Sequence, residues 1–179
     1  VVSTEGRILG ELKEPTRIGS WRELKAQLVA ICKKLEDQWG RASAIGIGSA
    51  GPLHAPSGKL LDPTNFGWKA PLVVNLAREL KLVLKRPVEL ENDAAAAVLA
   101  ERWKGGAGKN SVVLTLGTGL GMGVICNGQL VRGGRELHPE GGHLLLRPGD
   151  ASAPCGCGLL GCAEAFLSGV NFSARAARI

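Results

Sequence analysis

Three of the chain's five cysteines lie within eight residues, in the segment Cys155-Gly156-Cys157-Gly158-Leu159-Leu160-Gly161-Cys162. The glycines between them let the backbone turn sharply, so that the three sulfur atoms converge on one point. His143, twelve residues before Cys155, can supply a nitrogen as a fourth ligand. Three thiolates and one imidazole suit tetrahedral zinc, and a closed set of four ligands is typical of a structural site. The sequence therefore predicts a metal site that fixes this part of the chain.

Two other interpretations of this segment stay open. The three cysteines can be reduced thiols in a flexible loop, and His143 can be a core or surface histidine without a metal role. A disulfide framework is disfavoured because the chain has an odd number of cysteines, five, and opens without an export signal. We assign no metal role to His54 or His138.

The composition is that of a folded globular chain, with 45% hydrophobic and 21% charged residues among 179. The longest apolar run, 94–100, is far shorter than the roughly 20 residues of a membrane span, so no membrane partner is expected. The net charge is +6, but the basic residues are scattered and aromatic residues make up only 4%, which disfavours a nucleic-acid partner. A solvated surface is the favoured explanation of the charge, ahead of an anionic small ligand.

Strand and helix patterns alternate along the chain, which indicates an α/β fold. Ser20 and Glu23 form a capping box before a helical stripe of apolar residues that ends at Gly40. Asn127-Gly128 is a type I′ hairpin signal. The glycine-rich run 105–110 is the expected hinge between two lobes, residues 1–108 and 109–179. The other expected elements are two short strands within 1–10, strands at 43–48, 87–90, 111–116, 122–126 and 129–132, and helices at 72–80 and 94–103.

Two glycine motifs differ in what they predict. The run 46–51 matches G-x-G-x-x-G, but Pro52 follows where a dinucleotide site needs a helix to begin, so we exclude that site. The run 117–123 carries glycines at a spacing of two between two expected strands. Successive amides in such a turn form an anion-binding concavity, and the missing Cβ atoms leave room for a phosphate. An ordinary glycine-rich hairpin is the alternative.

Asp93 stands where an expected strand ends and a helix begins. Such a point places side chains in clefts, where a carboxylate can take a proton from a hydroxyl. The alternative, that Asp93 only caps the following helix, is favoured when the segment is taken alone. Glu140 and Glu164, taken alone, have the character of ordinary surface acids.

Together and in this order, these segments resemble the ROK family, which contains sugar kinases and sugar-responsive repressors. The likeness runs through nearly the whole chain. The matching segments are Gly46-Ile47-Gly48-Ser49-Ala50-Gly51-Pro52, Asn65-Phe66-Gly67-Trp68, Glu91-Asn92-Asp93-Ala94-Ala95, Leu116-Gly117-Thr118-Gly119-Leu120-Gly121, Glu140-Gly141-Gly142-His143, Cys155-Gly156-Cys157-Gly158, Gly161-Cys162 and Glu164.

The resemblance implies the two-lobed actin-like, ribonuclease-H-like ATPase fold. It also implies an ATP-dependent hexose kinase that moves the γ-phosphate to the 6-hydroxyl of a hexose, glucose first, with Asp93 as base and Mg²⁺ beside ATP. A structural zinc would order the sugar site. The implied sugar contacts are Gly51, Asn92, Asp93, Glu140, His143 and Glu164, the phosphate loop is Gly117, Thr118 and Gly119, and the zinc ligands are His143, Cys155, Cys157 and Cys162.

The resemblance is incomplete at both ends. Kinases of this family open with an Asp-x-Gly-Gly-Thr phosphate loop that does not precede Val1, and the chain stops before the adenosine-binding part. We therefore expect an internal fragment that is inactive alone, from a cytoplasmic protein that forms a homodimer or homotetramer at full length. A sugar-responsive repressor whose DNA-binding segment lies outside this chain is the alternative, and a free-standing zinc module is a third. Asp93 and the unblocked glycine loop favour the kinase.

Overall fold

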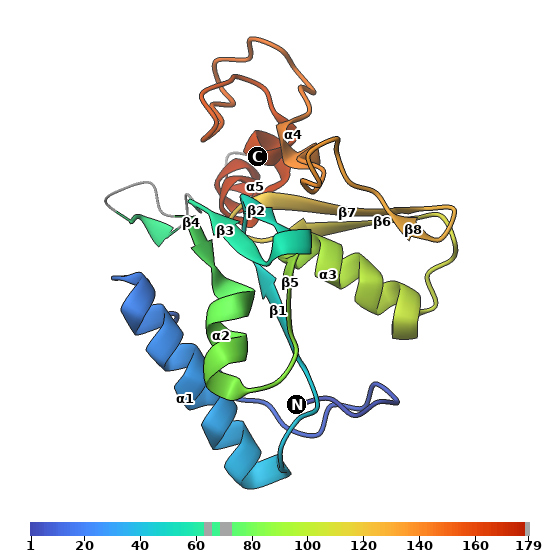
Figure 1. Ribbon diagram of the computed structural model, residues 1–179. Coiled ribbons are helices and arrows are strands. Elements are labelled where there is room, and N and C mark those ends of the chain that lie inside the picture. Colours follow the sequence, from blue (N-terminus) through green and yellow to red (C-terminus); the bar gives the residue numbers. More distant parts are fainter. Residues whose placement is uncertain (63–65, 69–72, 178–179) are drawn as a thin grey trace. The chain divides into compact units, whose positions relative to one another are not determined.

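The computed structural model describes residues 1–62, 66–68 and 73–177, and the chain divides into two compact units, Val1–Asn92 and Asp93–Ile179 (Figure 1). Each unit combines helices with strands, so the mixed α/β fold is confirmed. The expected boundary between lobes at residue 108 stays a prediction.

The first unit contains the longest described helix, α1 (Trp21–Trp39). The hydroxyl of Ser20 accepts a hydrogen bond from the Glu23 amide at 3.3 Å, which satisfies one of the free amides at the helix start. Gly40 ends the helix with a φ of 78°, a value that favours glycine. Both predicted ends of this helix are therefore confirmed.

Two small sheets make up the rest of this unit. Strand β1 (Ile45–Ser49) runs parallel to β5 (Val88–Asn92), with Ser49 opposite Asn92 at their carboxyl ends. Strands β2 (Leu53–His54), β3 (Lys59–Leu61) and β4 (Val73–Asn75) pair antiparallel, and the 3-10 turn η1 (Ala55–Ser57) joins the first two. Because β2 follows the glycines of β1, no helix begins where a dinucleotide site would need one, as Pro52 predicted.

The helix expected at 72–80 is wrong in its position. Leu72 lies outside the described residues, and helix α2 spans Leu76–Leu84. The Asn75 side chain caps it by accepting from the Arg78 amide at 3.0 Å, while the β-branched pair before Asn75 extends into β4. This shift puts three leucines at a spacing of four on the buried face of α2, beside α1 in Figure 1. The core of this unit consists of Leu53, Ala55, Leu60, Leu76, Leu80, Leu84, Val88 and Leu90.

The second unit is built on an antiparallel hairpin of β6 (Ser111–Leu116) and β7 (Leu120–Cys126), extended by β8 (Gln129–Leu130). Asn127 and Gly128 have φ values of 50° and 82°, which confirms the predicted type I′ turn. Helix α3 (Asp93–Ala100) lies across this hairpin and continues into the π-helical turn η3 (Glu101–Gly105) (Figure 1).

Two glycines of β7 allow this close packing of the helix on the sheet. A Cβ on Gly123 would lie 2.2 Å from the carbonyl oxygen of Ala94, and one on Gly121 would lie 3.0 Å from the Ala94 Cβ. No real Cβ fits at the first distance. The first turn of α3 therefore packs directly on β7. This packing explains why Gly121 and Gly123 are glycines.

Replacing Gly123 by Ala is expected to lower the free energy of unfolding by about 2–3 kcal/mol, because the added methyl overpacks the contact with α3. Urea unfolding followed by circular dichroism measures this change. Gly108→Ala is the matched control, since nothing lies within 4 Å of a Cβ at that position. Its unfolding free energy should change by less than about 0.5 kcal/mol, and equal effects of the two substitutions would contradict the packing argument.

After β8 the described chain is mostly loop until two short helices, α4 (Ala163–Leu167) and α5 (Gly169–Ala176). The loop contains the 3-10 turn η4 (Gly141–His143) and two isolated bridges, Leu145 with Cys162 and Pro154 with Leu160. Few apolar side chains fix this loop, so its shape depends on backbone hydrogen bonds and on whatever its side chains bind. Among the described residues, every helix is too short or too polar to cross a bilayer.

Candidate functional site

Four side chains of the second unit converge at the base of this loop. His143 ends η4, Cys155 and Cys157 lie in the loop, and Cys162 is the N-cap of α4. Their ligand atoms all lie within 4.8 Å of one another. His143 Nδ1 is 3.6 Å from Cys155 Sγ, and the sulfurs of Cys157 and Cys162 are 3.7 Å apart.

These distances suit a tetrahedral metal. Bond lengths of about 2.3 Å to sulfur and 2.0 Å to nitrogen put the ligand atoms of a tetrahedral zinc about 3.5–3.8 Å apart. The predicted convergence of His143 and the three cysteines is therefore confirmed, and the residues fit zinc. That zinc is the metal stays a prediction.

The backbone of the loop explains the glycines between the cysteines. Gly158 and Gly161 have φ values of 90° and 87°, in the region that strongly favours glycine. The Gly158 amide donates to the Cys155 carbonyl at 3.0 Å, which closes a tight turn around Cys157. A Cβ on Gly161 would lie 1.6 Å from the Arg147 carbonyl oxygen, so the two sides of the loop meet there.

At two of the three cysteines, Cys155 and Cys162, the pKa of the thiol is higher than that of an isolated thiol. Burial raises the pKa of the Cys155 thiol to about 12. Burial also raises the pKa of Cys162, whereas a backbone hydrogen bond from Leu159 lowers the pKa of Cys157. Three adjacent thiolates need a cation, so a metal that binds here must displace their protons.

Zinc affinity is accordingly expected to rise steeply with pH. Because up to three protons leave when the metal binds, the association constant should increase about a hundredfold to a thousandfold per pH unit between pH 6 and 7. Competition with a chelator whose own protonation is known measures this slope. An affinity that is flat across this interval would contradict coordination by the three thiols.

The glycine loop between β6 and β7 has an open side. Gly117 and Thr118 are exposed, and nothing lies within 4 Å of a Cβ placed on Gly117. The Gly117 amide donates to the Gly119 carbonyl at 3.0 Å, which keeps the turn tight. Gly119 differs, because the carboxylate of Glu164 occupies the space beside it. The loop therefore offers exposed backbone on the Gly117 side.

Asp93 is the first residue of α3, and its side chain is exposed. Its Oδ1 accepts from the Ala94 amide at 2.9 Å, and the positive end of the helix favours its negative charge. Since Ala94 packs against Gly121, the same contact brings the start of α3 to the strand that follows the glycine loop. The capping role and the proton-accepting role of Asp93 are both compatible with this position.

Two of the predicted sugar contacts belong to the first unit. Asn92 is buried at the carboxyl end of β5, where its backbone N–H donates to the Glu91 carboxylate at 2.8 Å. Gly51 follows β1 and precedes Pro52 across a cis peptide bond. In the matching loop 65–68, Asn65 lies outside the described residues.

Glu140 has a partner that the sequence analysis did not assign. His138 Nε2 lies 2.9 Å from Glu140 Oε1, and this hydrogen bond is the main cause that lowers the pKa of Glu140. The Glu140 carbonyl accepts from the His143 amide at 3.0 Å, and Glu140 is the N-cap of the turn that ends at His143. In the sequence, only the closeness of His138 and Glu140, with Pro139 between them, indicated this pair. Such a spacing is too common to predict a site.

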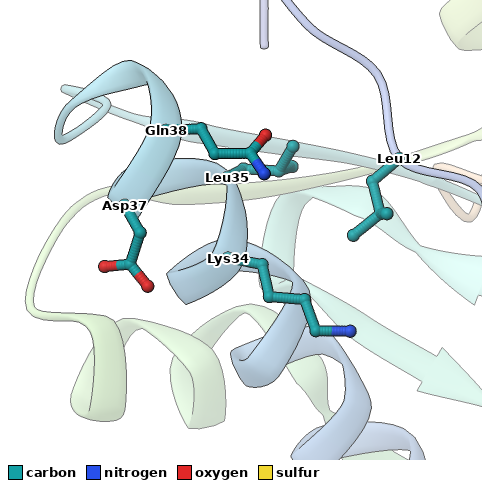
Figure 2. A pocket seen from close by; sticks show the side chains of 5 residues that line it. All are labelled: Leu12, Lys34, Leu35, Asp37 and Gln38. Atoms are coloured by element: carbon teal, nitrogen blue, oxygen red, sulfur yellow. The ribbon is translucent and has the colours of Figure 1, made fainter.

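The first unit also contains a small hollow. It has a volume of about 200 Å³, and Figure 2 shows Leu12 of the N-terminal segment across from side chains of α1. This volume is below the roughly 300 Å³ at which small-molecule sites begin. Its lining is Leu12, Lys34, Leu35, Asp37 and Gln38, which includes none of the predicted site residues.

The sequence pattern of the ROK family matches residues 1–178. The chain belongs to the ROK family. The glucokinase of Halalkalibacterium halodurans is 38% identical over 132 residues, which are 72% of this chain and 38% of that protein. The glucokinase of Thermotoga maritima is 36% identical over 172 residues, 94% of this chain and 52% of that protein. The N-acetyl-D-glucosamine kinase of Pectobacterium atrosepticum is 35% identical over 172 residues, 88% of this chain and 54% of that protein.

Solved ROK structures share the fold. The ROK hexokinase of Thermus thermophilus has a TM-score of 0.77 and 34% identity over 98% of this chain and 57% of its own. The ROK glucokinase of Streptomyces griseus in complex with glucose and AMPPNP has a TM-score of 0.82 and 31% identity over 99% of this chain and 55% of its own. A ROK transcriptional regulator homologous to the E. coli MLC protein has a TM-score of 0.73 and 25% identity, over 88% of this chain and 40% of its own.

These similarities confirm the predicted fold class, that of the actin-like ATPases to which ROK sugar kinases belong. The chain spans about half the length of the curated relatives and of the kinase structures that it matches.

Proposed function

We propose that this ROK chain carries the hexose site and one phosphate loop of an ATP-dependent hexose kinase, with glucose as the first candidate substrate. The observation that carries the proposal is the packing of Ala94 on Gly121, because it keeps Asp93 beside the strand that leaves the glycine loop. A base and a phosphate cradle must lie close together for phosphoryl transfer.

In the proposed reaction, the Asp93 carboxylate takes the proton of the sugar 6-hydroxyl. The freed oxygen attacks the γ-phosphorus, the bond from that phosphorus to the β-bridging oxygen breaks, and ADP leaves. The loop of Gly117, Thr118 and Gly119 would hold the phosphates on the side that Gly117 and Thr118 leave exposed, and Mg²⁺ that arrives with ATP would neutralise their charge. Such catalysis requires mainly positioning and charge stabilisation.

The sugar hydroxyls would be held by a set of polar groups. The metal centre would serve this set without entering the chemistry, because its four protein ligands leave no open position. His143 supports this assignment, since its Nδ1 faces Cys155 and the ring's other nitrogen remains for a hydroxyl. The proposed contacts are Gly51, Asn92, Asp93, Glu140, His143 and Glu164.

The kinase reading is favoured over the repressor. The reported relatives by sequence are sugar kinases, and this chain keeps both Asp93 and an open glycine loop, which a repressor does not need. A cytoplasmic location and a homodimer or homotetramer remain further proposals.

The test is an assay of the natural protein with ATP and a panel of hexoses: glucose, N-acetylglucosamine and N-acetylmannosamine. ADP formation that depends on glucose, with phosphate on the 6-hydroxyl by NMR, is the expected result. A protein that binds glucose in calorimetry but forms no ADP with any of these sugars would contradict the kinase and favour the repressor.

A further inference from the structure

Glu164 lies between the metal cluster and the glycine loop. It is on the first turn of α4, two residues after the metal ligand Cys162. One carboxylate oxygen, Oε1, is 3.7 Å from Cys155 Sγ. The other, Oε2, accepts a hydrogen bond from the Leu120 amide at 2.9 Å. A single side chain therefore touches both features.

The other end of α4 holds the same loop. The Gly169 amide, just after α4, donates to the Gly117 carbonyl at 2.8 Å. The Ser168 amide donates to the Glu164 carbonyl at 3.1 Å, which closes the helix between these two anchors. The segment 164–169 is thus hydrogen-bonded to the glycine loop at Gly117 and at Leu120.

The residue type at position 119 fits this arrangement. A Cβ on Gly119 would lie 2.5 Å from Glu164 Oε2, closer than real Cβ contacts allow. Leu120, whose amide donates to this carboxylate, is 7% exposed, so this part of the loop is fixed in the interior. Gly119 therefore leaves room for the carboxylate, whereas Gly117 leaves room for solvent or ligand.

We propose that Glu164 is a positioning residue that couples occupancy of the metal site to the order of the glycine loop. Helix α4 spans only Ala163–Leu167, so what holds its ends sets its position. A metal bound to Cys155 and Cys162 fixes the start of this helix, and Glu164 transmits that position to the Leu120 amide. Removing the metal loosens the loop through Glu164, the side chain that reaches both the metal cluster and the Leu120 amide.

This role is compatible with a sugar contact by Glu164, because a carboxylate has about four acceptor positions and the Leu120 amide uses one of them. The coupling is argued from the chain alone, and only the identity of the loop's ligand, the phosphates of ATP, rests on the proposed function.

The test is hydrogen–deuterium exchange of the peptide that spans 116–122, in the zinc-loaded natural protein and after chelation. Glu164→Ala, with zinc retained, should speed exchange at the Leu120 amide about tenfold or more, since a charge-assisted hydrogen bond is lost. Glu164→Gln keeps an acceptor and should restore most of the protection. Chelation of the parent protein should speed exchange in the same peptide.

Ser168→Ala is the matched control in the same segment, because the Ser168 hydroxyl is buried without a hydrogen-bond partner. It should leave the exchange of the loop within about twofold of the parent. Unchanged loop exchange in the chelated parent would overturn the coupling. This outcome is decisive even when the Glu164→Ala variant has lost its metal, because the chelated parent keeps Glu164. Unchanged exchange in zinc-loaded Glu164→Ala would overturn the role of Glu164. Neither readout needs a substrate, so failure of the proposed kinase activity is detected separately.

Discussion

Asp93→Asn in the natural protein is expected to lower kcat for hexose phosphorylation by about a thousandfold, because the amide cannot accept the proton of the 6-hydroxyl. The side chain keeps its size and its carbonyl oxygen, which can still accept from the Ala94 amide as Oδ1 does at 2.9 Å. The start of α3, and the packing of Ala94 on Gly121, should therefore be preserved. The dissociation constant for the hexose should change by less than about threefold, since binding does not need the proton transfer.

Steady-state kinetics and calorimetry on the same preparation measure the two quantities. Glu101→Gln is the control, because Glu101 is an exposed acid in the turn η3 that continues α3 and has no proposed role in the site. It should keep kcat within about twofold. An Asp93→Asn enzyme within tenfold of the parent would remove Asp93 from its role as base and leave it as a helix cap.

Cys157→Ser is expected to abolish stoichiometric zinc binding and to weaken hexose binding at least about tenfold. Serine is a poor zinc ligand, and the three remaining ligands cannot close a structural site. Loss of the metal frees Cys162 at the start of α4 and His143 at the end of η4, so Glu164 and Glu140 lose their fixed positions. Zinc content after dialysis and hexose binding by calorimetry are the measurements.

Cys126→Ser is the matched control for this substitution. Cys126 is exposed at the end of β7 and lies outside the cluster of four ligands. It should keep one zinc per chain and the hexose affinity of the parent. Full zinc stoichiometry in Cys157→Ser would show that Cys157 is not a ligand.

The features that sequence predicted best depend on local chemistry. Ser20 and Gly40 set the ends of α1, and Asn127-Gly128 sets the hairpin turn, because each acts on neighbouring backbone groups. The convergence of the cysteines was predictable for the same reason, since glycines between them leave few other outcomes.

Other features of the fold leave too weak a local pattern to be predicted. The three-stranded sheet of β2, β3 and β4 consists of strands of two or three residues, too short to show a period. Asn75 caps α2, but the apolar residues before it continue the helical spacing and hide the boundary.

The site shows the same limit. Glu164 has the pattern of a surface acid in sequence, and its partner, the Leu120 amide, is 44 residues away. Gly121 and Gly123 have the spacing of a phosphate loop, but they are explained by contact with α3. The ROK resemblance supplied the expected roles that local patterns could not, because it reflects the folded arrangement of whole segments.

X-ray absorption of the purified protein at the zinc edge tests the central claim most directly, that His143 and three cysteines form the metal centre around which the site is built. The account predicts one zinc per chain, with three sulfur ligands at about 2.3 Å and one nitrogen at about 2.0 Å. Protein that is folded yet takes up no stoichiometric zinc, or binds it through oxygen and nitrogen ligands alone, would contradict the account.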